Sequence, residues 1–159
     1  MLKSSETVLT MRHATLADLP AVVALLADDI NGAEREDASE PLDPGYVAAF
    51  AAIDENPDQE LIVAERDGVI VGTMQLSFLP GLSFRGAWRA QIEAVRIASD
   101  LRGSGLGTVM IDWAVARCRT RDCQMVQLTS KSTRHDAHRF YERLGFVKSH
   151  VGMKLHLHD

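Results

Sequence analysis

The fold of this chain is indicated first by a glycine-rich turn with the sequence Arg102-Gly103-Ser104-Gly105-Leu106-Gly107-Thr108. An apolar, strand-like segment at residues 92–97 precedes the turn, and a helical pattern follows it, with an expected apolar face at Leu106, Val109, Met110 and Trp113. A turn between a strand and a helix directs backbone N–H groups and the positive end of the helix dipole at one point in space. The turn therefore suits a phosphate or pyrophosphate group, to which Arg102 can add a charged contact.

The spacing of the glycines excludes two common phosphate-binding motifs. A P-loop needs Lys followed by Ser or Thr after its last glycine, whereas Thr108 and Val109 follow Gly107. The dinucleotide-binding motif needs a third glycine at the sixth position from Gly103, and that position is Thr108. The pattern that remains is Arg-x-x-Gly-x-Gly.

A second motif lies at residues 137–146 and reads Ala-x-x-Phe-Tyr-x-x-x-Gly-Phe. Its apolar residues share one helical face, and Gly145 is a natural helix stop. In this order and at this separation, the two motifs resemble those of the GNAT family of N-acetyltransferases. The motifs and the strand between them cover residues 91–146.

The resemblance implies a fold, a cosubstrate and a set of contacts. The fold is a single-domain α/β acyl-coenzyme A N-acyltransferase fold, with a mixed, mostly antiparallel sheet flanked by helices and two parallel strands that splay apart at the cofactor site. Acetyl-coenzyme A is the implied cosubstrate. Its thioester and pantetheine arm are expected at the backbone of Val95 and Ile97, and its pyrophosphate at Arg102, Gly103, Gly105, Leu106, Gly107 and Thr108.

The hydrophobic periodicity predicts the order of the elements. Strands are expected at residues 7–13, 61–65, 69–79, 88–97, 125–129 and 147–157, the last segment forming one strand or two. Helices are expected at residues 16–28, around Tyr46, Phe50 and Ile53, after the glycine turn, and at the second motif. Asp67-Gly68 is a strong hairpin signal between two of the strands. A crossover through the glycine turn makes strands 92–97 and 125–129 parallel neighbours.

Two residues are the candidates for proton transfer, because the attacking amine must be neutral and the leaving thiolate gains from a proton. The resemblance places Tyr141 as the general acid; packing in the core is the alternative, and the two roles can coexist. Glu93 is the candidate base, since it interrupts an apolar strand, where strict alternation puts it on the face of Val95 and Ile97. An ion pair with Arg96 or another arginine is the alternative for Glu93. His138, or a water held by Gln91, is the alternative base.

The acceptor side carries an acidic segment. Seven acidic residues lie from Asp28 to Asp43, against one arginine. The resemblance places this connection in the wall of the acceptor site, where it would attract a cationic amine; a solvated loop is the alternative. Arg134 stands where the family often has an asparagine that contacts pantetheine, so no role is assigned to it.

The composition limits the number of domains and the kinds of partner that the chain is expected to have. A chain of 159 residues with 46% hydrophobic residues is expected to form one globular domain, residues 1–159. Its net charge of −5 disfavours a nucleic-acid partner. The lack of a signal-like segment, or of an apolar run near the roughly 20 residues that span a bilayer, predicts a cytoplasmic protein without a membrane partner.

The remaining predictions concern metals, assembly and reaction. Two cysteines without a second pair predict reduced thiols, and the histidine pairs lack the further ligands of a metal site, so no metal is expected. Edge strands near the C-terminus predict a homodimer. The overall prediction is acetyl transfer to a primary amine of a small molecule by direct attack. The alternative is a non-catalytic acyl-coenzyme A sensor or regulatory protein.

Overall fold

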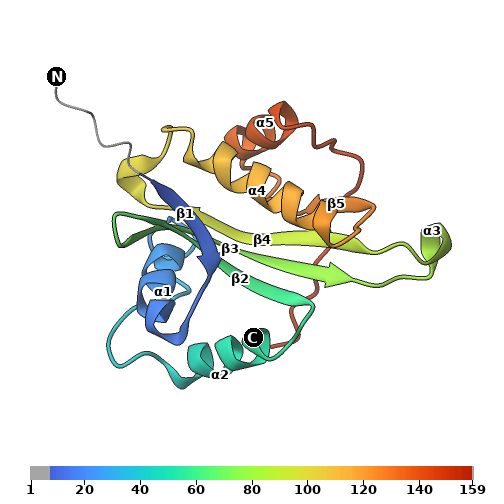
Figure 1. The fold of residues 1–159 in the computed structure, drawn as a ribbon. Coiled ribbons are helices and arrows are strands. Elements are labelled where there is room, and N and C mark those ends of the chain that lie inside the picture. The colour runs from blue at the N-terminus through green and yellow to red at the C-terminus, as the bar shows by residue number, and fades with distance from the viewer. Residues whose placement is uncertain (1–7, 159) are drawn as a thin grey trace.

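The computed structural model describes residues 8–158, and its centre is a sheet of five strands in the order β1-β2-β3-β4-β5 (Figure 1). The strands are β1 (Leu9–His13), β2 (Gln59–Arg66), β3 (Val69–Leu79), β4 (Arg89–Ile97) and β5 (Met125–Leu128). Neighbouring strands are antiparallel except for β4 and β5, which are parallel. This confirms the predicted mixed, mostly antiparallel sheet.

Helices cover both faces of the sheet. On one face lie α1 (Leu19–Ala27) and α2 (Pro44–Asp54), and on the other lie α4 (Leu106–Thr120) and α5 (His135–Arg143) (Figure 1). A 3-10 turn, Leu16–Asp18, precedes α1, which has its proline in the first turn, where no backbone N–H is needed. A second 3-10 turn, Ser99–Leu101, links β4 to the glycine turn, and a short helix, α3 (Ser83–Gly86), lies in the β3–β4 connection.

The core has two parts, one on each face of the sheet. Alternation along β2 places Ile62 and Ala64 in the larger core beneath α4, and Val63 in the smaller core with α1 and α2. In α4 the buried face differs from the predicted one, because Val109 is half-exposed and Ile111 and Ala114 are buried instead. The predicted hairpin is present, with Asp67 and Gly68 both at positive φ, 51° and 79°.

The C-terminal segment differs from the prediction. Residues 147–157 alternate apolar and polar side chains almost throughout, but no strand forms there within the described part of the chain. Val151, Met153 and Leu155 are each at least 85% exposed. A strand needs a neighbouring edge for its backbone hydrogen bonds, and the adjacent β5 is only four residues long. At the other end, Thr7, the first residue of the predicted first strand, lies outside the described residues.

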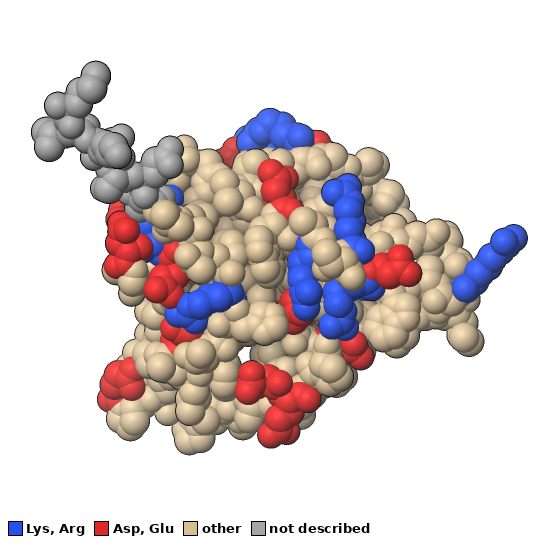
Figure 2. Space-filling view, viewed as in Figure 1, with Lys and Arg blue, Asp and Glu red and all other residues tan. Residues whose placement is uncertain are grey.

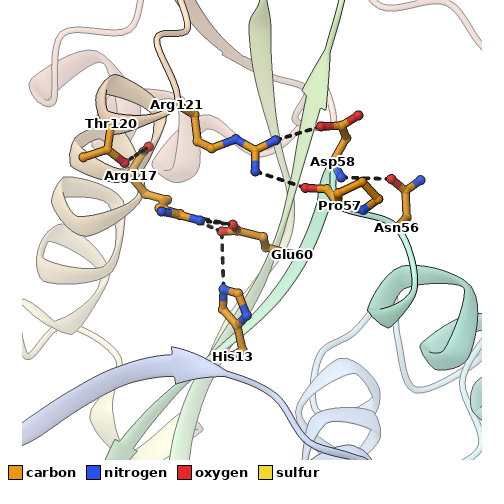
Figure 3. A network of polar contacts seen from close by, with 8 residues as sticks. All are labelled: His13, Asn56, Pro57, Asp58, Glu60, Arg117, Thr120 and Arg121. Atoms are coloured by element: carbon orange, nitrogen blue, oxygen red, sulfur yellow. Dashed lines mark hydrogen bonds and ion pairs between the residues drawn. The ribbon is translucent and has the colours of Figure 1, made fainter.

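A partly buried ion pair ties α4 to the sheet at the end away from the glycine turn (Figure 3). Glu60 of β2 is 5% exposed, and both of its carboxylate oxygens accept hydrogen bonds of 3.1 Å from Nε of Arg117 in α4. His13 approaches the same carboxylate, with Nε2 at 3.7 Å from Oε2. Arg121, the residue directly after α4, donates to Asp58 at 2.7 Å and lies over the ring of Phe78.

We predict that Glu60→Ala lowers the free energy of unfolding by about 3 kcal/mol, because it leaves Arg117 without its carboxylate partner in a partly buried site. Arg139→Ala removes an exposed pair with Asp136 and should cost less than about 1 kcal/mol. Urea denaturation of both variants measures the difference. Equal losses would show that the buried pair does not anchor α4.

Candidate active site

The parallel strands β4 and β5 separate part-way along their length. Their pairing runs from Arg89–Met125 to Ile92–Leu128 and ends there, whereas β4 continues to Ile97. From Glu93 onward, no strand formed by residues 8–158 lies beside the edge of β4 that faced β5. Its backbone N–H and C=O groups on that side need other partners, which an amide-containing ligand can supply.

A β-bulge lies in the same stretch of β4. Gln75 of β3 is opposite Glu93 and Thr73 is opposite Arg96, so two residues of β4, Ala94 and Val95, face one residue of β3. Ala94 has a φ of 52°, in the left-handed region that a non-glycine residue seldom adopts. Bulges of this kind bend a strand and redirect the side chains that follow.

The bulge overturns one expectation from simple alternation. Val95 and Ile97 pack against the larger core beneath α4. Glu93 is opposite Gln75, which is opposite Leu61 of the smaller core, so Glu93 lies on the other face, toward α1 and α2. The prediction that Glu93 shares a face with Val95 and Ile97 is wrong, because the extra residue reverses the alternation after Glu93.

Glu93 accepts a hydrogen bond from the first of two linked glutamine amides, and it forms no ion pair with any of residues 8–158. Gln91 donates from Nε2 to Oε1 of Glu93 at 2.5 Å, and Gln127 of β5 donates from Nε2 to Oε1 of Gln91 at 3.0 Å. Arg96, the alternative partner named from the sequence, instead pairs with Asp29 at 2.9 Å and donates to the carbonyl of Val95. Glu93 is exposed and lies beside the separation of β4 and β5.

The three glycines of the turn have different surroundings. Gly103 and Gly105 have φ of 80° and 88°, and a Cβ at either would meet no atom of residues 8–158 within 4 Å. A Cβ at Gly107 would lie 3.1 Å from Cδ1 of Ile97 and 3.2 Å from Cζ of Phe140. The first two therefore leave open space at the start of α4, and the third allows α4 to pack closely on β4 and α5.

The other predicted cofactor contacts lie at the same turn. Leu106 is buried as the first residue of α4, and Thr108 is half-buried in its first turn. Arg102 donates from Nη2 to the backbone carbonyl of Asp28 at 2.6 Å, and so connects the turn to the end of α1. The start of α4 thus presents free helix N–H groups beside an arginine, which is an arrangement that binds phosphate oxygens.

Tyr141 lies on α5 with its ring in the core. The ring contacts Phe140 and Phe146 edge to face, at centroid distances of 5.0 and 5.7 Å. Burial raises the pKa of its hydroxyl above the ordinary value, although the nearby charges of Arg134 and Arg96 oppose this. The ring therefore packs in the core, which was the alternative to a role as general acid. The hydroxyl stays protonated at neutral pH and can still donate a proton.

His138, the alternative base, is constrained by its contacts. Its Nε2 lies 2.8 Å from the carbonyl oxygen of Lys131 and must carry the proton of that hydrogen bond. Its Nδ1 is buried and has no hydrogen-bond partner among residues 8–158.

The acidic segment is largely engaged in local contacts. Asp29 pairs with Arg96; burial raises its pKa, but the N–H of Gly32 and the charge of Arg96 hold the pKa below the ordinary value. Glu36 accepts a hydrogen bond from Tyr46, and Asp43 caps α2 through the N–H of Gly45. In Figure 2 acidic and basic side chains are mixed over the upper part of the visible face, whereas its lower part shows acidic side chains without basic ones. An acidic wall open to a cationic substrate is therefore not supported by these contacts and stays a prediction.

Comparison with known proteins agrees with this geometry. The model of the acetyltransferase (GNAT) family matches residues 27–146. The chain belongs to this family. The aminoalkylphosphonate N-acetyltransferase of Salmonella typhimurium is 29% identical over 140 residues, which are 88% of this chain and 86% of that protein.

Two solved structures are similar to this acetyltransferase over most of its length. A transcriptional regulator from Bacillus halodurans C-125 has a TM-score of 0.92 and 46% identity, covering 94% of this chain and 100% of that one. A putative acetyltransferase from Agrobacterium tumefaciens has a TM-score of 0.81 and 27% identity, covering 92% and 99%. The predicted family, fold and enzyme class, an acetyl-coenzyme A-dependent N-acetyltransferase, are confirmed.

Two further findings concern only residues 8–158 of this GNAT protein. None of the helices in that range has the length and apolar character needed to cross a membrane. The same residues contain no group of three or more His, Cys, Asp or Glu side chains that could hold a metal ion.

We predict that Gly105→Glu weakens coenzyme A binding about a hundredfold or more, because it places a carboxylate where the pyrophosphate is expected. Gly68→Glu is the matched control, since Gly68 also has a positive φ, 79°, and open space around its Cβ but lies in the β2–β3 hairpin. Calorimetric titration measures both affinities. Equal affinities in the two folded variants would contradict the assignment of the pyrophosphate to the glycine turn.

Proposed function

We propose that this protein transfers acetyl from acetyl-coenzyme A to a primary amine of a small molecule, by direct attack of the amine on the thioester. The observation that carries the proposal is the unpaired edge of β4 after Ile92. This stretch of β4 lies close to the glycine turn and to α5, since a Cβ at Gly107 would contact both Ile97 and Phe140. The relative from Salmonella typhimurium, an N-acetyltransferase of an aminoalkylphosphonate, supports a small amine as the acceptor.

The two ends of the cofactor are assigned to two parts of the chain. The pyrophosphate is assigned to Arg102 and to the backbone of residues 103–108, where Gly103 and Gly105 leave room for it. The pantetheine arm and thioester are assigned to the free edge of β4 at Val95 and Ile97, whose polar backbone groups the arm can satisfy as an added strand would.

The chemical step then requires one bond to form and one to break. The amine nitrogen attacks the carbonyl carbon of the thioester, and the C–S bond breaks as the tetrahedral intermediate collapses. Glu93, directly or through a water, accepts the proton that the nitrogen loses, and Tyr141 donates its hydroxyl proton to the leaving thiolate. Because a thiolate is already a good leaving group, the acid contributes less to the rate than the positioning of the amine.

The cysteines take no part in this scheme. Cys118 is buried at the far end of α4, and burial, together with the neighbouring Cys123 and Glu60, raises its pKa to about 11. A thiol with that pKa is almost wholly protonated at neutral pH and is a poor nucleophile. A cytoplasmic location and a homodimer stay predictions from the sequence.

A second candidate is a regulatory acyl-coenzyme A sensor without turnover, favoured by the transcriptional regulator among the similar structures. Calorimetric titration with acetyl-coenzyme A, followed by thiol release against a panel of primary amines, separates the two. Amine-dependent thiol release supports the enzyme. Tight binding without release from any amine supports the sensor, and absence of binding contradicts both.

We predict that Tyr141→Phe lowers kcat between about tenfold and a hundredfold and leaves the Kd for acetyl-coenzyme A nearly unchanged, because the ring that packs in the core is retained. Since burial raises the pKa of Tyr141, the wild-type kcat should show no loss between pH 7 and pH 9 from ionisation of this group. Steady-state kinetics over this range check both points. An unchanged kcat in the variant would leave Tyr141 a purely structural residue.

A further inference from the structure

A row of polar side chains crosses the sheet on the face toward α1 and α2. Gln59 of β2 is opposite Ser77 of β3, Ser77 is opposite Gln91 of β4, and Gln91 is opposite Gln127 of β5. Residues opposite one another in a sheet lie on the same face, and Gln59 shares that face with Leu61 of the smaller core. The row therefore lies on the same side of the sheet as Glu93.

The four side chains of the row are uncharged, and each is hydrogen-bonded to another member of the row. Gln59 accepts from Ser77 at 2.9 Å and from Gln75 at 3.0 Å, whereas Gln127 donates to Gln91 and Gln91 to Glu93. A side-chain amide has two N–H groups and an oxygen with two lone pairs, so Gln91 and Gln127 keep capacity for further bonds. Half-buried amides with unused capacity suit a ligand that carries amide or hydroxyl groups.

A hollow of about 260 Å³ adjoins the row at its β5 end. It is lined by Gln127 and Met125 of β5, Arg89 of β4, and the aromatic side chains of Phe84 and Trp88 from the β3–β4 connection. Met125 and Arg89 are opposite each other and two residues before Gln127 and Gln91, so the hollow opens on the same face as the row. Its volume lies below the usual range of whole ligand pockets, and it suits one apolar group of a ligand.

The loop that carries the aromatic residues has an unusual backbone. Phe84 and Arg85 both have positive φ, 53° and 58°, which for such residues costs free energy and recurs at ligand sites. Phe84 is 74% exposed although it is apolar. In Figure 2 the projection that carries α3 is mostly tan, with basic atoms at its tip. The loop thus holds an aromatic surface at the edge of the hollow.

The spacing between the hollow and Glu93 sets the length of a ligand that uses both. Arg89 and Glu93 are four residues apart on β4, and a strand rises about 3.3 Å per residue, so the separation is roughly 13 Å. Gln91 lies midway. An acceptor with its amine at Glu93 would therefore pass its middle over the amides of Gln91 and Gln127 before it reached the aromatic hollow.

We propose that Gln91, Gln127 and the hollow at Trp88 form an acceptor subsite. It takes an extended small amine that carries amide or hydroxyl groups along its length and an aromatic or apolar group roughly 13 Å from the nitrogen. This inference rests on the proposed function, since it places the reacting amine beside Glu93. It also distinguishes this chain's acceptor from a short aminoalkylphosphonate, which would not reach the hollow.

The test compares two tetrapeptide amides as probes, Ala-Ala-Ala-Phe-amide and Ala-Ala-Ala-Ala-amide. In an extended chain the fourth residue lies about 11 Å beyond the first, so its phenyl group can reach the hollow. Burial of the phenyl group should raise kcat/KM of the wild-type enzyme for the first probe about tenfold or more over the second. In Trp88→Ala this ratio should fall toward one. Leu82→Ala is the matched control, because Leu82 lies in the same loop, is 97% exposed and does not line the hollow; the ratio should stay as in the wild type.

Binding of the probes is measured independently of turnover, by calorimetric titration into the complex with coenzyme A. Tighter binding of Ala-Ala-Ala-Phe-amide, weakened in both Trp88→Ala and Gln127→Ala, supports the subsite. Equal affinity and equal kcat/KM of the two probes in the wild type, or a preference that survives Trp88→Ala, overturns it. Selective binding without thiol release from any amine would keep the subsite and overturn the proposed function alone.

Discussion

The hydrogen-bonding groups of the β4 backbone are the constraint on which the rest of the structure depends. The strand is paired on both sides as far as Ile92, and beyond that point β5 no longer accompanies it. In the same stretch the extra residue at Ala94 changes which face each following side chain occupies. An unpaired strand edge in the middle of a sheet is costly unless something else satisfies it. We propose that a cosubstrate with amide groups along its arm is the partner of this edge.

The neighbouring elements bring two helices close to that edge. Gly72 of β3 leaves room for Met110 of α4, since a Cβ there would lie 2.7 Å from its sulfur. Gly107 of α4 likewise leaves room for the side chains of Ile97 in β4 and Phe140 in α5. Close packing places the start of α4 at one end of the free edge and Tyr141 near it. The ion pair of Glu60 with Arg117 holds the opposite end of α4 on the sheet.

The sequence allowed the local elements of this region to be predicted well. The glycine turn, the hairpin at Asp67-Gly68 and the helix at Tyr141 each depend on residues close together in the chain, and all are present. The bulge at Ala94 was not predictable by alternation, because an alanine at positive φ leaves no compositional signal. As a result Glu93 was placed on the wrong face. The pattern of residues 147–157 predicted a strand, but alternation cannot show whether a partner edge exists. The row from Gln59 to Gln127 was also not foreseen, since its members come together only through the register of four strands.

Backbone hydrogen exchange with and without acetyl-coenzyme A tests most directly where this cosubstrate lies on the protein. The free edge of β4 and the glycine turn should exchange more slowly in the complex, at residues 93–97 and 103–108, while β1 and β2 should be unaffected. Binding that protected a different region, and left residues 93–97 exchanging as before, would contradict the assignment of the separation between β4 and β5 as the cofactor site.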